Sequence, residues 1–210
     1  ELDAQRFVCG SAEMKKAALQ GAPDAESALS GARDIIAERI SEEAPIREAM
    51  RASFRQRRIV SKLRGSGKDK ADAAKYRSYF DYSFPLARIP SHNLLAILRA
   101  ETEGIVSVSL DTDAEKCCAK IYYEWAQKHG YAPERSASQI KEAIADSFKR
   151  LIEPSISAEV IREAKEKADR ESIKIFGDNL RQLLMGAPVG QKRTMAIDPG
   201  FRNGCKIVCL

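Results

Sequence analysis

The feature that most constrains the fold is a long stretch of helical spacing near the end of the chain, from Ser157 to Met185. Apolar residues recur along it three and four positions apart, which places them on one face of an α-helix. Gly186 and Pro188 follow directly, and both residue types are common just past a helix end. We therefore predict one long helix with a buried apolar face, made of Val160, Ile161, Ala164, Ala168, Ile175, Phe176, Leu180, Leu183 and Leu184.

Most of the remaining chain carries the same spacing. The segments 24–41, 45–54 and 112–129 each begin with a residue type typical of helix starts and continue with apolar residues three and four apart. Residues 140–152 form another apolar stripe. We expect Pro154 to end that helix, because proline has no amide hydrogen and crowds the preceding turn.

Two short segments depart from the helical pattern. Apolar and polar residues alternate in the basic stretch that includes Ile59–Leu63, and Ile105–Leu110 is rich in β-branched residues. Both features are typical of strands, and we expect the two segments to pair. The predicted fold is therefore mainly α, a multi-helical body with a minor two-stranded β element.

Composition excludes several classes of protein. The chain has 210 residues, of which 44% are hydrophobic and 31% charged, as in an ordinary soluble protein with a core of its own. We find no apolar run of membrane-spanning length and no signal-peptide pattern, so we expect a cytoplasmic protein without a membrane partner. The five cysteines lack the spacing of a zinc site, so we expect reduced thiols and no cofactor. The net charge of +5 only hints at a polyanionic partner.

The last residues have the pattern of a β-hairpin. Met195–Ile197 is apolar and ends at Asp198, two turn signals follow, and Cys205–Leu210 is apolar again. A two-stranded hairpin is marginal alone. We therefore expect this hairpin either to be poorly packed or to take a partner strand from a neighbouring chain, and we expect the natural chain to continue past Leu210. The first residue is Glu1 rather than Met, so we expect the start to be internal as well.

The hairpin also carries a family resemblance. The segment Ile197-Asp198-Pro199-Gly200-Phe201-Arg202-Asn203-Gly204-Cys205-Lys206 resembles the opening of the YqgF domain, an RNase H-like fold related to the RuvC Holliday-junction resolvases. It resembles most closely that segment of the Tex family of bacterial transcription accessory proteins. Similar strings stand upstream, at Tyr79–Ser83, Ile89–His92 and Asn179–Leu184, so that the resemblance runs from Ala32 to Leu210. Asn93 and Asn203 depart from it, where the family usually has Arg and Thr.

The resemblance implies a domain organisation and a function. Residues 1–190 would be the helical central region of a Tex-like protein, and residues 191–210 the first, incomplete hairpin of an α/β RNase H-like domain. The whole protein would be a nucleic-acid-binding transcription accessory factor. This segment would serve as a scaffold, with RNA or DNA and the transcription machinery as partners.

Asp198 is the one residue with a catalytic interpretation. By resemblance it stands where RNase H-like nucleases place the first of several carboxylates that hold two metal ions. One carboxylate cannot hold two hard cations, so we predict no catalytic residue and no enzyme in this segment. Two alternatives stay open. The intact protein could be a metal-dependent nuclease or resolvase, or Asp198 could simply begin an Asp-Pro-Gly turn.

A run of basic residues is the best candidate for contact with nucleic acid. Cationic side chains neutralise phosphates and release counterions, which gives sequence-independent, salt-sensitive binding. The alternative is a solvated helix face and strand edge, where such side chains also prevent aggregation. A third hypothesis is a scaffold that binds only proteins. The candidate residues, with no acidic residue among them, are Arg51, Arg55, Arg57, Arg58, Lys62 and Arg64.

Overall fold

The computed structural model describes residues 25–68, 70, 73–129, 134–187, 190–200 and 204–209. The chain forms two compact units, Glu1–Ser172 and Ile173–Leu210. The predicted domain boundary after residue 190 stays a prediction.

Helices make up most of the described chain, so the predicted mainly α fold is confirmed. The α-helices are α3 (Ala25–Glu42), α4 (Ala44–Phe54), α5 (Ser91–Thr102), α6 (Ala114–His129), α7 (Glu134–Asp146) and α8 (Glu153–Leu184). Short 3₁₀ helices are η2 (Gly65–Gly67), η3 (Ala73–Tyr79) and η4 (Leu86–Arg88), and η5 (Ser147–Ile152) is a π-helical turn. The strands are β1 (Arg58–Leu63), β2 (Asp81–Pro85), β3 (Val106–Leu110), β4 (Met195–Pro199) and β5 (Cys205–Cys209).

The first unit contains an antiparallel sheet with strand order β2-β1-β3. The predicted pairing is confirmed, because Ile59 lies opposite Leu110 and Leu63 opposite Val106. The structure adds a third strand, β2, in which Phe84 lies opposite Ile59. The sequence did not reveal β2 because it has only five residues and ends in a proline, which gives a weak strand signal.

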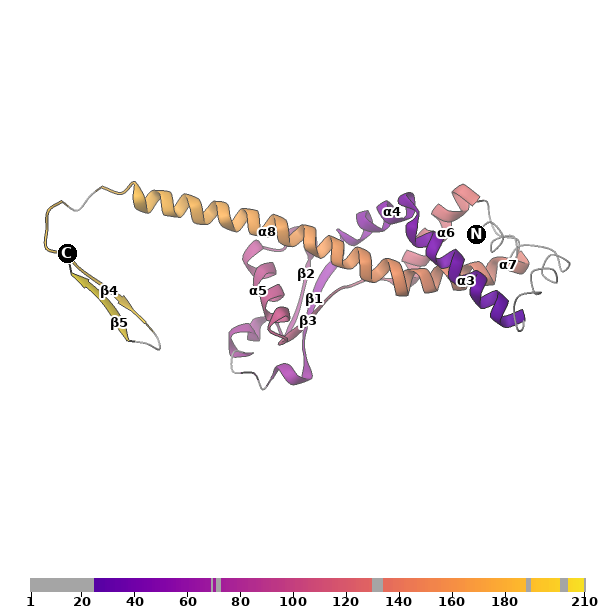
Figure 1. Ribbon diagram of the computed structural model, residues 1–210, viewed down its shortest axis with the longest axis horizontal. Coiled ribbons are helices and arrows are strands. Elements are labelled where there is room, and N and C mark those ends of the chain that lie inside the picture. Colours follow the sequence, from indigo (N-terminus) through magenta and orange to yellow (C-terminus); the bar gives the residue numbers. More distant parts are fainter. Residues whose placement is uncertain are drawn as a thin grey trace. The chain divides into compact units, whose positions relative to one another are not determined.

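The sheet has one covered and one open face, because successive side chains of a strand point to opposite sides. Ile59, Ser61, Val106 and Leu110 are buried on the covered face, beside which α5 lies (Figure 1). On the other side most side chains are exposed, and Val60 is half-buried. We call this surface the open sheet face, and it consists of Arg58, Val60, Lys62, Asp81, Ser83, Ser107 and Ser109.

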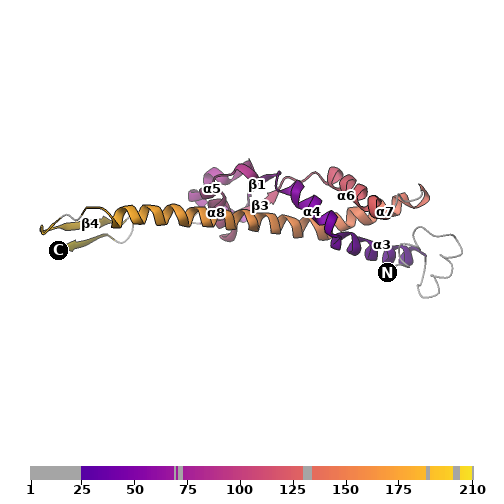
Figure 2. The same cartoon turned by 90° about the horizontal axis from the view of Figure 1, so that it is seen from above.

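The main core lies among α3, α4, α6, α7 and the first half of α8. Phe54 of α4 and Phe148 of η5 are both fully buried, with their rings edge to face at 6.4 Å between centroids. Figure 2 shows α6 and α7 side by side, and they are in contact. The buried hydroxyl of Ser147 donates a hydrogen bond of 2.7 Å to the Ala37 carbonyl of α3, so this polar group is satisfied.

The prediction that Pro154 ends a helix is wrong. From Glu134 to Leu184 the chain is helical throughout, through α7, η5 and α8. The amide of Glu153 donates to the Phe148 carbonyl, five residues back, as in a π-turn. A π-turn shifts the hydrogen-bond ladder by one residue, and Pro154, in the first turn after the shift, is accommodated without a break.

The burial predicted for the long helix is only partly correct. Val160 and Ala168 are buried, and Ile161 and Ala164 pack against the core. The predicted core residues after position 172 are exposed instead. Their exposed fractions are 57% for Ile175, 67% for Phe176, 42% for Leu180, 79% for Leu183 and 75% for Leu184.

The second unit contains the predicted hairpin. β4 and β5 are antiparallel, with Met195 opposite Cys209 and Asp198 opposite Lys206. Every residue of the two strands is exposed. This exposure agrees with the expectation of a poorly packed hairpin.

No helix in the described ranges is both long enough and apolar enough to cross a membrane.

Candidate nucleic-acid interface

The helical half of the basic run is held in ion pairs with acidic residues. Arg51 of α4 donates through Nε to Glu159 Oε1 of α8 at 2.8 Å, and Arg55 donates to Glu163 at 3.2 Å. The hydrogen bond from Arg51 holds the pKa of Glu159 below its usual value. Glu48 adds a second carboxylate near both arginines. The charges of Arg51 and Arg55 are therefore largely balanced, and their contacts tie α4 to α8.

Arg57 lies between the two halves of the run and is half-buried. Its guanidinium interacts with the Cys117 thiol of α6, whose pKa is nevertheless raised by burial. Packing against α6 limits the part of Arg57 that a partner could reach.

Arg58 keeps its charge without a carboxylate partner. Its Nε donates to the Ser83 hydroxyl at 2.8 Å and its Nη2 to the Ser83 carbonyl at 2.7 Å. Both acceptors are neutral, so they fix the guanidinium across the β1–β2 pair without cancelling its charge. Within the part of the chain that the structure describes, neither Arg58 nor Lys62 forms an ion pair.

Lys62 also borders a hollow at the end of β1. The hollow has a volume of about 540 Å³ and exposes three cationic side chains, those of Lys62, Arg64 and Lys68. Its remaining wall comes from Leu63, Gly65, Phe80 and Asp81. We call it the basic hollow. Asp81 is the single carboxylate among these lining residues.

The loop after β1 gives the basic hollow its shape. The Arg64 amide donates to the Ile105 carbonyl at 3.0 Å, and the Gly67 amide donates to the Arg64 carbonyl at 2.8 Å. A Cβ on Gly67 would lie 2.2 Å from the Ile105 carbonyl oxygen, far inside van der Waals contact. Only glycine therefore lets this loop pack so closely on the chain that leads into β3.

A second hollow, of about 420 Å³, lies beside Arg55 between η4 and α8. Lys167 and Arg170 line it, together with Glu163, the ion-pair partner of Arg55. This surface is a rival basic patch.

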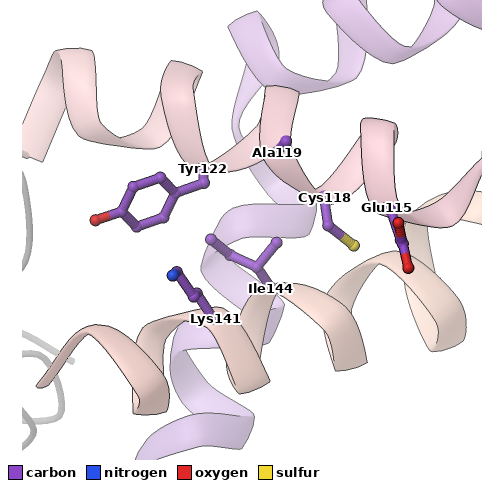
Figure 3. Close-up of a pocket in the computed structure, with 6 residues that line it drawn as sticks. All are labelled: Glu115, Cys118, Ala119, Tyr122, Lys141 and Ile144. Atoms are coloured by element: carbon purple, nitrogen blue, oxygen red, sulfur yellow. The ribbon is translucent and has the colours of Figure 1, made fainter.

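A third hollow lies between α6 and α7 and is mostly apolar (Figure 3). Cys118 and Tyr122 reach into it from α6, and Ile144 and Lys141 from α7. Burial raises the pKa of the Cys118 thiol, so this group is a poor nucleophile. With a volume of about 460 Å³ and few polar groups, the hollow offers little that would bind an anion.

Asp198 is exposed on β4 in the second unit, opposite Lys206. Among the residues that the structure describes, no three His, Cys, Asp or Glu side chains are grouped as metal ligands would be. The role of Asp198 therefore stays a prediction.

The structure divides the basic run in a way the sequence did not indicate. It separates the ion-paired Arg51 and Arg55 from Arg58, Lys62 and Arg64, which have no ion-pair partner among the described residues. It also adds Lys68, Phe80 and Asp81 to the candidate surface. The loop at residues 65–68 is glycine-rich but too short for a phosphate-binding loop, so it was only a weak signal for Lys68. Phe80 stands in a run of aromatic residues that is more typical of a core than of base stacking, and strand pairing brings Asp81 beside Lys62.

Known proteins match the chain over most of its length. The family model described as Tex central region-like matches residues 3–176. A Bacillus subtilis (strain 168) protein named YdcI is 37% identical over 185 residues, which are 87% of this chain and 25% of that protein. The Transcriptional accessory protein Tex of Neisseria gonorrhoeae is 31% identical over 186 residues, 88% of this chain and 24% of that protein. The human S1 RNA-binding domain-containing protein 1 is 29% identical over 189 residues, 86% of this chain and 19% of that protein. The chain thus spans about a quarter of the length of its first relatives, and it belongs to the Tex family through a Tex central region-like segment.

Proposed function

We propose that this chain is a helical scaffold within a nucleic-acid-binding transcription accessory factor, and that it contacts RNA or DNA through the open sheet face. The names of its relatives, which include a transcriptional accessory protein and an S1 RNA-binding domain-containing protein, support a nucleic-acid-associated role. The observation that carries the location of the contact is that Arg58 and Lys62 form no ion pair among the described residues, although Asp81 lies opposite Lys62, whereas Arg51 and Arg55 are ion-paired.

The open sheet face has the chemistry that a phosphate backbone requires. A guanidinium held by neutral acceptors is already oriented, so it loses little conformational freedom on binding an anion. The exposed hydroxyl of Ser109, opposite Val60, supplies a further donor, whereas the Ser107 hydroxyl already donates to the Lys62 carbonyl at 3.3 Å. None of these groups recognises a particular base, so we expect sequence-independent binding that weakens as the salt concentration rises.

The ion pairs between α4 and α8 suit the scaffold role. Arg47 and Arg51 share Glu159, and Arg55 pairs with Glu163 one turn further along α8. We propose that α8 carries this body toward an RNase H-like domain that begins near residue 191, as the resemblance of residues 197–206 implies. In this proposal the segment binds nucleic acid and positions the RNase H-like domain, and Asp198 performs no catalysis within the segment.

Fluorescence anisotropy of labelled single-stranded RNA and of duplex DNA tests the proposed contact. We would compare wild type with the double variant Arg58→Ala/Lys62→Ala at low and moderate salt. Removal of two phosphate-binding cations should weaken binding about tenfold or more and reduce the salt dependence of log Kd by roughly 1.4 for the single strand. Thermal unfolding would show that the variant is folded.

Two matched double variants serve as controls. Arg51→Ala/Arg55→Ala removes the same charge from the ion-paired surface, and Lys167→Ala/Arg170→Ala removes it from the rival patch. Both should bind almost as tightly as wild type. Loss of binding in either control, with Arg58→Ala/Lys62→Ala unaffected, would place the contact elsewhere. No binding at low salt by wild type would favour the scaffold that binds only proteins.

A further inference from the structure

We infer that the basic hollow holds one phosphate of a single-stranded nucleic acid and that the adjoining base contacts Phe80. This inference rests on the proposed function and adds the class of strand and the residues that select it. It also assigns roles to Lys68, Phe80 and Gly67, which lie outside the basic run.

The charges around the hollow favour an anion. Lys62, Arg64 and Lys68 come from two adjacent pieces of chain, the end of β1 and the loop after it, and all three are exposed. Asp81 is the one carboxylate on the wall, so the lining carries a net positive charge. The described residues offer Lys62, Arg64 and Lys68 no ion-pair partner, in contrast to Arg51 and Arg55. A phosphate would supply the missing negative charge.

The shape of the hollow favours a single strand over a duplex. Its volume of about 540 Å³ lies within the range of about 300–1,000 Å³ that is usual for ligand sites. Half-buried Phe80 lines the hollow and also packs against the core cluster that includes Tyr76 and Val106. A base in a duplex is stacked between its neighbours and cannot reach such a ring, whereas a base of a single strand can.

The hollow continues into the open sheet face. Lys62 belongs to both surfaces, and Arg58 lies four residues back along the same strand. At about 3.3 Å per residue this separation is about 13 Å. A strand leaving the hollow over Lys62 would therefore follow β1 toward Arg58 and keep its phosphates near cations.

The test uses the 210-residue chain and three probes: a labelled oligo(U) of 12 nucleotides, a duplex of the same length and long-chain polyphosphate. We expect Arg64→Ala and Lys68→Ala each to weaken oligo(U) binding about three- to tenfold. Each should also reduce the slope of log Kd against log salt by about 0.7. Lys149→Ala, which removes an exposed charge from η5, is the matched control and should bind as wild type does.

Phe80→Leu separates recognition of a base from recognition of charge. Leucine keeps an apolar side chain at this half-buried position, so we expect the variant to fold. Removal of the ring should weaken oligo(U) binding at least threefold and leave polyphosphate binding unchanged. The duplex should be affected less than oligo(U) by all three substitutions.

The outcomes distinguish this inference from the proposed function. If Arg64→Ala, Lys68→Ala and Phe80→Leu all bind oligo(U) as wild type does, while Arg58→Ala/Lys62→Ala does not, the hollow is not the site and the open sheet face remains. Equal losses for polyphosphate, duplex and oligo(U), with no effect of Phe80→Leu, would overturn the selection of single strands. Absence of any binding at low salt would overturn both.

Discussion

At the scale of single residues, a side chain matters here through the partner that the fold supplies. Arg51 and Arg58 are alike in sequence, yet one faces Glu159 and the other Ser83. The ion pair of Arg51 with Glu159 stabilises the contact between α4 and α8. The hydrogen bonds of Arg58 to Ser83 leave the charge of Arg58 available to a ligand. Charged residues within one run can therefore have opposite roles.

Gly67 is a residue whose replacement we expect to be costly. In Gly67→Ala the new Cβ would meet the Ile105 carbonyl oxygen at 2.2 Å, so the loop or β3 must move. We expect a loss of about 1–3 kcal/mol in the free energy of unfolding, measured by urea denaturation. Gly65→Ala is the control, since a Cβ there meets nothing within 4 Å. Equal stability of the two variants would contradict the close contact.

Glu43 gives the stability of the protein a pH dependence. Burial pushes the pKa of this carboxyl upward, but hydrogen bonds from His129 at 2.7 Å and Lys128 at 3.1 Å outweigh it and lower the pKa below the ordinary 4.5. Because the folded-state pKa is lowered, the charged carboxylate of Glu43 stabilises the fold at pH values above the ordinary pKa. This contribution to stability is lost as the pH falls through the folded-state pKa.

The corresponding test is urea denaturation of Glu43→Gln at pH 7 and at pH 3. We expect the variant to be less stable than wild type by about 1 kcal/mol at pH 7, because its hydrogen bonds no longer have a charged acceptor. At pH 3, below the ordinary pKa of 4.5, the difference should shrink, because the unfolded carboxyl then binds a proton and the stabilising contribution of the folded carboxylate is being lost. Glu42→Gln, at the neighbouring position, should show no such pH dependence. A difference that stays constant with pH would refute the role of Glu43.

At the scale of elements, α8 shows that one helix can have two environments. Ile156 is fully buried in its first turns, whereas Ile175 is 57% exposed on the same helix. Spacing alone predicted a continuous buried face, because periodicity reports which side of a helix is apolar and not how far a neighbouring element extends along it. The extent of packing is a tertiary property.

This difference along α8 can be measured with one type of substitution. Ile156→Ala should lower the free energy of unfolding by about 2–5 kcal/mol, because it leaves a cavity in the core. Ile175→Ala removes the same atoms from an exposed site, and we expect a change within about 0.5 kcal/mol. Urea denaturation of both variants measures the effect. A large loss in Ile175→Ala would mean that another part of the protein or a second copy covers this residue.

At the scale of the whole molecule, local patterns predicted the mainly α class, the pairing of β1 with β3 and the C-terminal hairpin. These features follow from short-range spacing and turn residues, which act within a few positions of each other. Family resemblance, confirmed by the match to the Tex central region-like model over residues 3–176, supplied the identity. Local patterns failed at Pro154, where a π-turn preserved the helix, and at β2, which is short and ends in proline.

The sequence by itself thus determined most of the helices, the pairing of β1 with β3, the C-terminal hairpin and the presence of a basic run between residues 51 and 64. Only the tertiary structure decided which of those charges remain available. Glu159 and Glu163 stand more than a hundred positions from Arg51 and Arg55, and packing of α8 on α4 brings them together. Strand pairing likewise places Asp81 and Ser83 beside Lys62 and Arg58. Electrostatic interactions depend on distance in space, and the fold sets that distance for residues far apart in the chain.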